Sequence, residues 1–326
     1  MIDIHEVGTR RENYAKNAAD ELFLTSFNEH LAKQEFLVET AGNGADIPVI
    51  YIVGAPRSGT TLLSQVISKF LPVGYIDNLI ARFWLRPSVG IRLSSVMLGK
   101  DSRRAIDFAS KHGVTEGLAG PHEFGYFWSH GFRLNQAKTH HLTLSEIARL
   151  DKTTLKASIE KEILAQFDRP VVFKNVTCGF QAPLLTELHE NSLFIHISRD
   201  IRATCASILK LRFDRYGDYS TWWSLKPSTF EKLPKDPVRQ VVQQVRDCRS
   251  EIQRQINQSG AHALEVTYEE LCMNPNAVLK MVSDKLAFMG APISDQGICP
   301  PFSPGKCSWL PDHLMAQLDA EISNLL

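Results

Sequence analysis

The chain has 326 residues, of which 44% are apolar and 22% charged, proportions typical of a folded globular protein. Lysine and arginine number 36, as do aspartate and glutamate, so the formal net charge is zero. This balance gives no reason to expect nucleic acid or an anionic membrane surface as a partner. No signal-peptide core, bilayer-spanning run or C-x-x-C pair is visible, so we expect a cytoplasmic protein with reduced thiols, no transmembrane segment and no metal site.

The first part of the chain predicts a helix followed by a strand. Residues 11–38 carry apolar side chains at helical spacing, which indicates an amphipathic helix. It belongs to an expected N-terminal helical arm, residues 1–46, packed on a single domain that spans 1–326. Residues 49–53 form an apolar, β-branched run that predicts a buried strand, and apolar spacing predicts a helix over 59–71.

A glycine-bounded loop joins this strand to this helix. Gly54 and Gly59 have the spacing of the phosphate-binding loop G-x-x-x-x-G-K-[ST], and Thr61 supplies its final hydroxyl. Thr60 replaces the lysine that reaches the β/γ-phosphates of a nucleoside triphosphate, and the nearest cation is Arg57. The first amides of a helix lack intrahelical partners and attract anions, so we expect a phosphate site unsuited to ordinary ATP or GTP hydrolysis. Its expected contacts are Gly54, Pro56, Arg57, Ser58, Gly59, Thr60 and Thr61.

Strands and helices then alternate. Short apolar runs predict strands over 171–173, 193–198 and 263–267, and helical spacing predicts helices over 144–167, 236–259 and 274–290. This order favours an α/β fold of the P-loop NTPase type, with three layers and a central parallel sheet flanked by helices. Lys174 follows the second strand and Arg199 the third, at the edge where such sheets bind ligands.

Two aromatic segments are candidates for pocket walls. Residues 120–128 combine four aromatic residues with the pair His122 and Glu123, and they form either a pocket wall or core packing. Residues 213–235 are rich in loops and aromatic residues. They are expected to form a lid or an acceptor-site insertion, with ordinary packing under a long loop as the alternative.

Three motifs together resemble the sulfotransferases that use 3′-phosphoadenosine 5′-phosphosulfate (PAPS). Residues 56–61, PRSGTT, look like the 5′-phosphosulfate loop of that family in its Golgi-type and bacterial form. Arg199, within RDIRA, and Ser207 are similar to its 3′-phosphate motif, although Ile201 replaces the usual proline. Tyr268 begins a segment, YEEL followed by Pro275, that matches the adenine-side motif. The segment around Lys306 resembles a late cationic loop of that family, although the usual R-K-G pattern is missing here.

The resemblance implies transfer of a sulfuryl group from PAPS to an acceptor hydroxyl, on a glycan or a small metabolite, without a metal. The product would be 3′-phosphoadenosine 5′-phosphate (PAP). Arg57 and Lys174 would stabilise negative charge on the leaving phosphate. A P-loop kinase that uses Mg-ATP and a catalytically inactive nucleotide-binding module are the alternatives.

The general base stays open at this point. The histidine that cytosolic members carry two residues after the lysine is excluded, because Val176 occupies that position. Asp77 falls where other members have a carboxylate downstream of the P-loop helix, and His122 and Glu123 are rivals. Asp77 could instead serve only as a helix cap.

Overall fold

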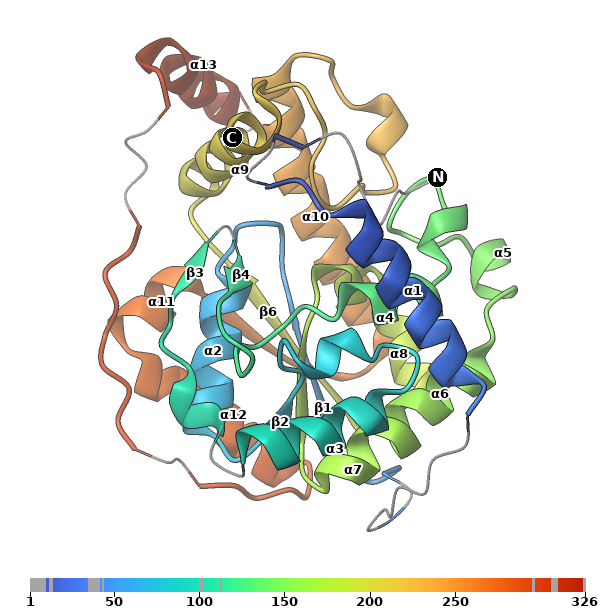
Figure 1. Ribbon diagram of the computed structural model, residues 1–326. Helices are drawn as coiled ribbons and strands as arrows, with labels where there is room; N and C mark the ends of the chain where they lie inside the picture. Colours follow the sequence, from blue (N-terminus) through green and yellow to red (C-terminus); the bar gives the residue numbers. More distant parts are fainter. Residues whose placement is uncertain are drawn as a thin grey trace.

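The computed structural model describes residues 10–11, 14–34, 42, 44–99, 102–111, 113–294, 297–305 and 310–324 (Figure 1). Within these ranges, five parallel strands form one sheet in the order β2-β5-β1-β6-β7. The strands are β1 (Val49–Val53), β2 (Gly74–Tyr75), β5 (Val171–Lys174), β6 (Ser192–Ser198) and β7 (His262–Thr267). The expected α/β fold with a parallel central sheet is therefore confirmed.

Helices surround this sheet (Figure 1), and buried apolar side chains form two hydrophobic cores. The described helices are α1 (Ala18–Ala32), α2 (Thr60–Phe70), α3 (Pro87–Leu98), α4 (Gly125–Gly131), α5 (Leu144–Ile147), α6 (Lys152–Ile159), α7 (Ala165–Phe167), α8 (Ala182–Leu188), α9 (Ile201–Tyr216), α10 (Pro237–Ser259), α11 (Tyr268–Met273), α12 (Pro275–Phe288) and α13 (Asp312–Ser323). A two-stranded antiparallel hairpin, β3 (Ser110–Lys111) with β4 (Val114–Thr115), lies outside the sheet.

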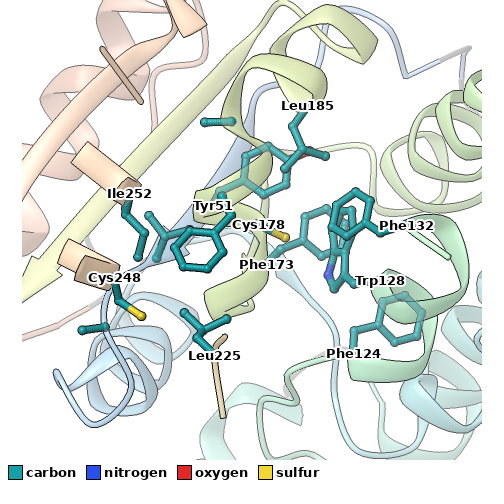
Figure 2. Close-up of a cluster of buried hydrophobic side chains, with 14 of the residues drawn as sticks. Tyr51, Phe124, Trp128, Phe132, Phe173, Cys178, Leu185, Leu225, Cys248 and Ile252 are labelled. Carbon is teal, nitrogen blue, oxygen red and sulfur yellow. The ribbon is translucent and has the colours of Figure 1, made fainter. Parts of the chain in front are cut away.

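Alternate side chains of β1 enter opposite cores, as the two-residue period of a strand requires. Ile50 and Ile52 pack with apolar residues of α2 and α12. Tyr51 faces the other way and stacks on Phe173 and Phe194, with ring centroids 5.9 and 4.9 Å apart (Figure 2). Trp128 of α4 packs edge-on against Phe173 at 5.2 Å and closes this second core. The central strand is thus buried on both faces, which explains its continuous apolar sequence.

Two expected helices are interrupted or shorter in the structure. The single helix expected over 144–167 is wrong: the segment divides into α5, α6, a π-helical turn (Glu160–Leu164) and α7. Asp151 is the cause of one break, because its carboxylate accepts from Thr154 N at 3.0 Å and caps a new helix. The helix expected over 11–38 begins only after Asn17, whose side chain caps α1, and ends at Ala32; residues 35–38 lie outside the described ranges.

The expected helix starts at Asp236-Pro237 and Asn274-Pro275 are confirmed. Each acidic or amide side chain accepts from the backbone three residues on, and each proline occupies the first turn. Of the helices that the structure describes, none is long and apolar enough to span a bilayer.

All five parallel strands end at the same edge of the sheet, and four of these ends continue into residues singled out by the sequence. β1 leads into the P-loop, β5 ends at Lys174, β6 is followed by Arg199, and β7 is followed by Tyr268. Parallel pairing therefore brings together side chains that are more than 200 residues apart in sequence.

Candidate functional site

A cavity of about 780 Å³ lies at this edge of the sheet. Its walls include the P-loop, the residues after β6 and β7, segments 121–126 and 221–226, and the start of the N-terminal arm. A cavity of this size suits a ligand as large as a nucleotide. No group of three or more His, Cys, Asp or Glu side chains in the described ranges is arranged to hold a metal ion.

The P-loop is shaped by two glycines. Gly59 is the residue before α2 and has φ 103°, a left-handed conformation that favours glycine. A Cβ atom on Gly59 would lie 2.4 Å from the ring of Tyr268, and one on Gly54 would lie 2.4 Å from the carbonyl oxygen of Ile197. The loop therefore packs closely against the ends of β6 and β7. The hydroxyl of Ser58 is buried in this loop and has no hydrogen-bond partner among the described residues.

Arg57 links the P-loop to helix α9. Its own φ is 66°, and its Nε donates to Oγ of Ser207 at 3.0 Å. Burial lowers the pKa of this guanidinium, and the neighbouring charge of Arg199 acts in the same direction. Two arginines close enough to repel one another favour an anion between or beside them. The structure thus brings together Arg57, Arg199 and Ser207, as the sequence motifs predicted.

Arg199 is held against the adenine-side motif. Its guanidinium lies 4.4 Å from the centre of the Tyr268 ring, and its Nη2 donates to Gly305 O at 3.3 Å. Arg249 of α10 donates to the backbone carbonyl of Arg199. Gly305 belongs to the late loop expected to carry a further cation, but Lys306 itself lies outside the described residues.

Lys174 and Glu123 form an ion pair beside the P-loop. Nζ of Lys174 and Oε1 of Glu123 are 2.5 Å apart, and the side chain of Lys174 is 1% exposed whereas that of Glu123 is 49% exposed. Asn175 donates to the carbonyl of Glu123 at 3.0 Å and fixes its backbone. Desolvation raises the pKa of Glu123, but the charge of Lys174, the hydrogen bond from Lys174 and the charges of His122 and Arg57 together lower it further, so the net shift is downward. The pair presents an ionised carboxylate to the cavity.

His122 lines the same cavity but has one ring nitrogen occupied. Its Nδ1 accepts from Phe124 N at 2.8 Å, so the neutral ring carries its proton on Nε2. Burial lowers the pKa of His122 to about 4, and the positive charges of Lys174 and Arg82 act in the same direction. At neutral pH this ring is therefore a hydrogen-bond donor at Nε2 and has no free nitrogen to accept a proton.

Asp77 is not among the residues that line the cavity. It is 2% exposed, accepts from Ile80 N at 2.7 Å, and accepts from Ser94 Oγ of α3 at 2.5 Å. Its carboxylate begins the 3₁₀ turn η2 (Ile80–Arg82). This placement does not match the expectation that Asp77 is the general base. It matches the alternative, in which the side chain of Asp77 caps a helical turn.

We expect Asp77→Ala to lower the free energy of unfolding by about 1 kcal/mol, because Ile80 N and the Ser94 hydroxyl lose their acceptor. Denaturant unfolding at neutral pH measures this change. Asp77→Asn is the matched control, because it keeps an acceptor for Ile80 N. Burial raises the pKa of Asp77 in the folded protein. The stability of wild type relative to Asp77→Asn should therefore fall as pH rises through that pKa.

The two aromatic segments divide between core and cavity. In the first, Phe124, Phe127 and Trp128 belong to the core, whereas Tyr126 lines the cavity. In the second, Trp222 and Trp223 line the cavity.

The second segment is attached to the body of the protein by buried polar groups. Gln244 of α10, which is fully buried, donates to the carbonyls of Trp223 and Leu225, both at 3.0 Å. Arg212 of α9 donates to Tyr219 O at 3.1 Å. These bonds attach the segment to α9 and α10 and hold its two indole rings at the cavity wall.

Several residues that line the cavity were not predicted from the sequence. They are basic side chains that come from the N-terminal arm, from the turn after β2, from the last turn of α9 and from the segment after α9: Arg10, Lys16, Arg82, Arg215 and Lys226. None lies in a motif, and the arm was expected only to pack on the domain. The one local signal was the sequence DNLIAR, in which Asp77 caps a turn that ends at Arg82.

The fold and the site define an α/β protein with a basic cavity at the carboxyl edge of its parallel sheet, beside a glycine-bounded strand–helix loop. The sequence profile described as the sulfotransferase family matches residues 48–295, which is more than half of the chain. The chain therefore belongs to the sulfotransferase family, as its motifs indicated. No match to a curated protein was found.

Solved sulfotransferase structures resemble the chain at low sequence identity. Sulfotransferase STF9 from Mycobacterium avium is 13% identical with a TM-score of 0.49, over 98% of this chain and 88% of that one. Sulfotransferase STF1 from Mycobacterium tuberculosis H37Rv is 16% identical with a TM-score of 0.43, over 84% and 76%. The sulfotransferase domain of the Synechococcus PCC 7002 olefin synthase is 18% identical with a TM-score of 0.37, over 79% and 78%. Similarity at this level adds nothing to the family assignment.

Proposed function

We propose that this protein transfers a sulfuryl group from PAPS to an acceptor hydroxyl, on a glycan or a small metabolite, and releases PAP. One observation carries the proposal. The P-loop and Arg199 line the same cavity, and the ionised carboxylate of Glu123 lies beside them. The first set suits a donor with two phosphate groups, and the carboxylate suits removal of a hydroxyl proton.

The charges and contacts at the P-loop and at Arg199 support a donor site. The amides at the start of α2 and the guanidinium of Arg57 would hold the 5′-phosphosulfate. Arg199 and Ser207 would hold the 3′-phosphate, with the Tyr268 ring beside the adenine. The unpartnered hydroxyl of Ser58 and the close contact between Gly59 and Tyr268 support a site built for a bound nucleotide. Lys306, the last expected contact, stays a proposal from its sequence position.

The transfer would break the bond between sulfur and the bridging phosphate oxygen and form a bond between sulfur and the acceptor oxygen. The phosphate oxygen gains negative charge, which Arg57, in the cavity wall, and Lys174, buried behind Glu123, would stabilise. The acceptor proton would pass to Glu123. In a loose transition state of this kind the acceptor oxygen is only weakly bonded, so a carboxylate of low pKa is an adequate base.

Among the three candidates for the base, the contacts support Glu123. Its carboxylate faces the cavity beside Lys174, and it interacts electrostatically with Arg57. Neutral His122 would donate a hydrogen bond through Nε2 and would not take the proton. Asp77 would contribute only by capping its turn.

Nucleotide binding tests the proposal. PAP should raise the thermal midpoint and should bind at least tenfold more tightly than adenosine 5′-phosphate, because charge-assisted bonds from Arg199 to the 3′-phosphate are lost in the shorter nucleotide. Calorimetry gives both affinities, and ATP with Mg²⁺ serves as the comparison for the kinase alternative. Equal affinity for the two adenosine nucleotides, or tighter binding of Mg-ATP, would contradict the proposal. Turnover of PAPS in the presence of EDTA separates an enzyme from an inactive module.

A further inference from the structure

The cavity is much more basic than the chain as a whole. Among the described residues that line it, seven are lysine or arginine and two are glutamate, whereas the formal net charge of the whole chain is zero. Arg57 and Arg199 belong to the proposed donor site. The remaining basic side chains lie on walls that the donor site does not use.

Arg82 is the clearest member of this second group. It is exposed, it lines the cavity, and its guanidinium makes no ion pair with any residue in the described ranges. The backbone that carries it is fixed from both sides. Asp77 caps the start of its turn, and the buried side chain of Asn28 in α1 donates to Arg82 O at 2.8 Å. A long charged side chain on so rigid a turn is typical of a residue that receives a ligand.

Further basic side chains converge on the same part of the cavity. Lys16 of the N-terminal arm donates to the Tyr126 hydroxyl, and its Nζ lies 3.5 Å from Oε2 of Glu21. Burial and the Glu21 contact raise the pKa of the Tyr126 phenol, while the positive charges of Arg82 and Arg10 oppose that rise. Arg82 and Lys16 also act on His122, the neighbour of Glu123. This wall of Arg10, Lys16 and Arg82 is therefore next to the carboxylate proposed as the base.

We propose that the acceptor is itself an anion: a hydroxyl compound with a carboxylate or another acidic oxygen group, which Arg82 binds while the hydroxyl faces Glu123. This inference rests on the proposed function and specifies its substrate class. The two described glutamates that line the cavity already face Lys174 and Lys16, so no lining carboxylate in the described ranges pairs with Arg82, and its guanidinium can receive an anionic ligand. The indole rings of Trp222 and Trp223 on the other wall suit the ring of a sugar or an aromatic acceptor.

Matched pairs of small ligands test the charge preference with the donor site filled by saturating PAP. One pair is 4-nitrophenyl β-D-glucuronide and 4-nitrophenyl β-D-glucoside, and the other is 4-hydroxyphenylacetate and 4-hydroxyphenylacetamide. In at least one pair the anionic member should bind about ten- to a hundredfold more tightly in calorimetry, the usual value of a charge-assisted hydrogen bond. The pair that responds shows whether the acceptor is a sugar acid or an aromatic acid.

Arg82→Gln should abolish most of that difference and should leave the affinities for PAP and for the neutral members unchanged. Arg92→Gln is the matched control, because Arg92 is an exposed arginine of α3 outside the cavity. Equal binding within both pairs, no binding of any of the four ligands at millimolar concentration, or a difference that survives in Arg82→Gln would overturn the inference. Failure of wild type to bind PAP would instead contradict the proposed function, so the two failures are distinguishable.

Discussion

Arg57→Ala should reduce turnover by about a hundredfold or more, the usual consequence of removing one preorganised donor from a developing negative charge. The same change should weaken binding of PAP, because the guanidinium is expected to contact the 5′-phosphosulfate in the ground state as well. The structure gives a reason for so large an effect. Arg57 lies in the P-loop with φ 66°, and its hydrogen bond to Ser207 fixes the guanidinium in position.

The measurement compares kcat, the dissociation constant of PAP and the thermal midpoint of the variant with those of wild type. Arg92→Ala controls for the loss of an arginine elsewhere, since Arg92 is exposed on α3 and lies outside the cavity. A loss of turnover of only a few-fold, with the fold intact, would show that Arg57 is not placed at the leaving group.

Glu123→Gln should lower turnover by about 10² to 10⁴ and leave the affinity for PAP nearly unchanged. Glutamine keeps the shape of the side chain and an oxygen that can accept from Lys174, but it cannot take the acceptor proton. Asp77→Asn is the matched control, a second loss of one carboxylate, at a position that does not line the cavity. Its turnover should stay within a few-fold of wild type. If Asp77→Asn abolished turnover while Glu123→Gln did not, the assignment of the base would be reversed.

The pH dependence of kcat/KM gives an independent test of the same assignment. The base must be ionised, and although desolvation raises the pKa of Glu123, the charge and hydrogen bond of Lys174 together with the charges of His122 and Arg57 hold it below its usual range. Activity should therefore persist into mildly acidic solution and fall only as pH drops through this lowered pKa. The acid limb should be absent from the residual activity of Glu123→Gln. Burial raises the pKa of Asp77, so an acid limb above the usual range of an aspartate would point to that residue instead.

The parallel sheet and the donor motifs could be predicted because their signals are local. A buried strand is a continuous apolar run, and the P-loop lies wholly within residues 54–61. Once the strands are known to be parallel, Lys174 and Arg199 must lie at the same edge as that loop. The breaks in the segment 144–167 were not predicted, because apolar spacing continues through the point where Asp151 starts a new helix.

The acceptor side of the cavity could not be predicted in the same way. The contact between Asn28 and the turn at Arg82 joins segments 54 residues apart by a bond to a backbone carbonyl, which leaves no sequence pattern. The position of Asp77, about twenty residues after Arg57, suggested a base. Only the three-dimensional contacts show that its carboxylate turns toward Ile80 N and Ser94. Spacing in the sequence predicts the position of a residue in the backbone, whereas tertiary packing determines the direction of its side chain.

The hydrogen bond from Arg57 to Ser207 couples the two parts of the proposed donor site. It joins the loop proposed to hold one phosphate to the helix proposed to hold the other, at 3.0 Å. Because Arg57 and Ser207 are in contact before any nucleotide binds, substitution of either residue changes the surroundings of the other. The energies lost on substituting Arg57 and Ser207 are then coupled and do not sum to the effect of the double substitution.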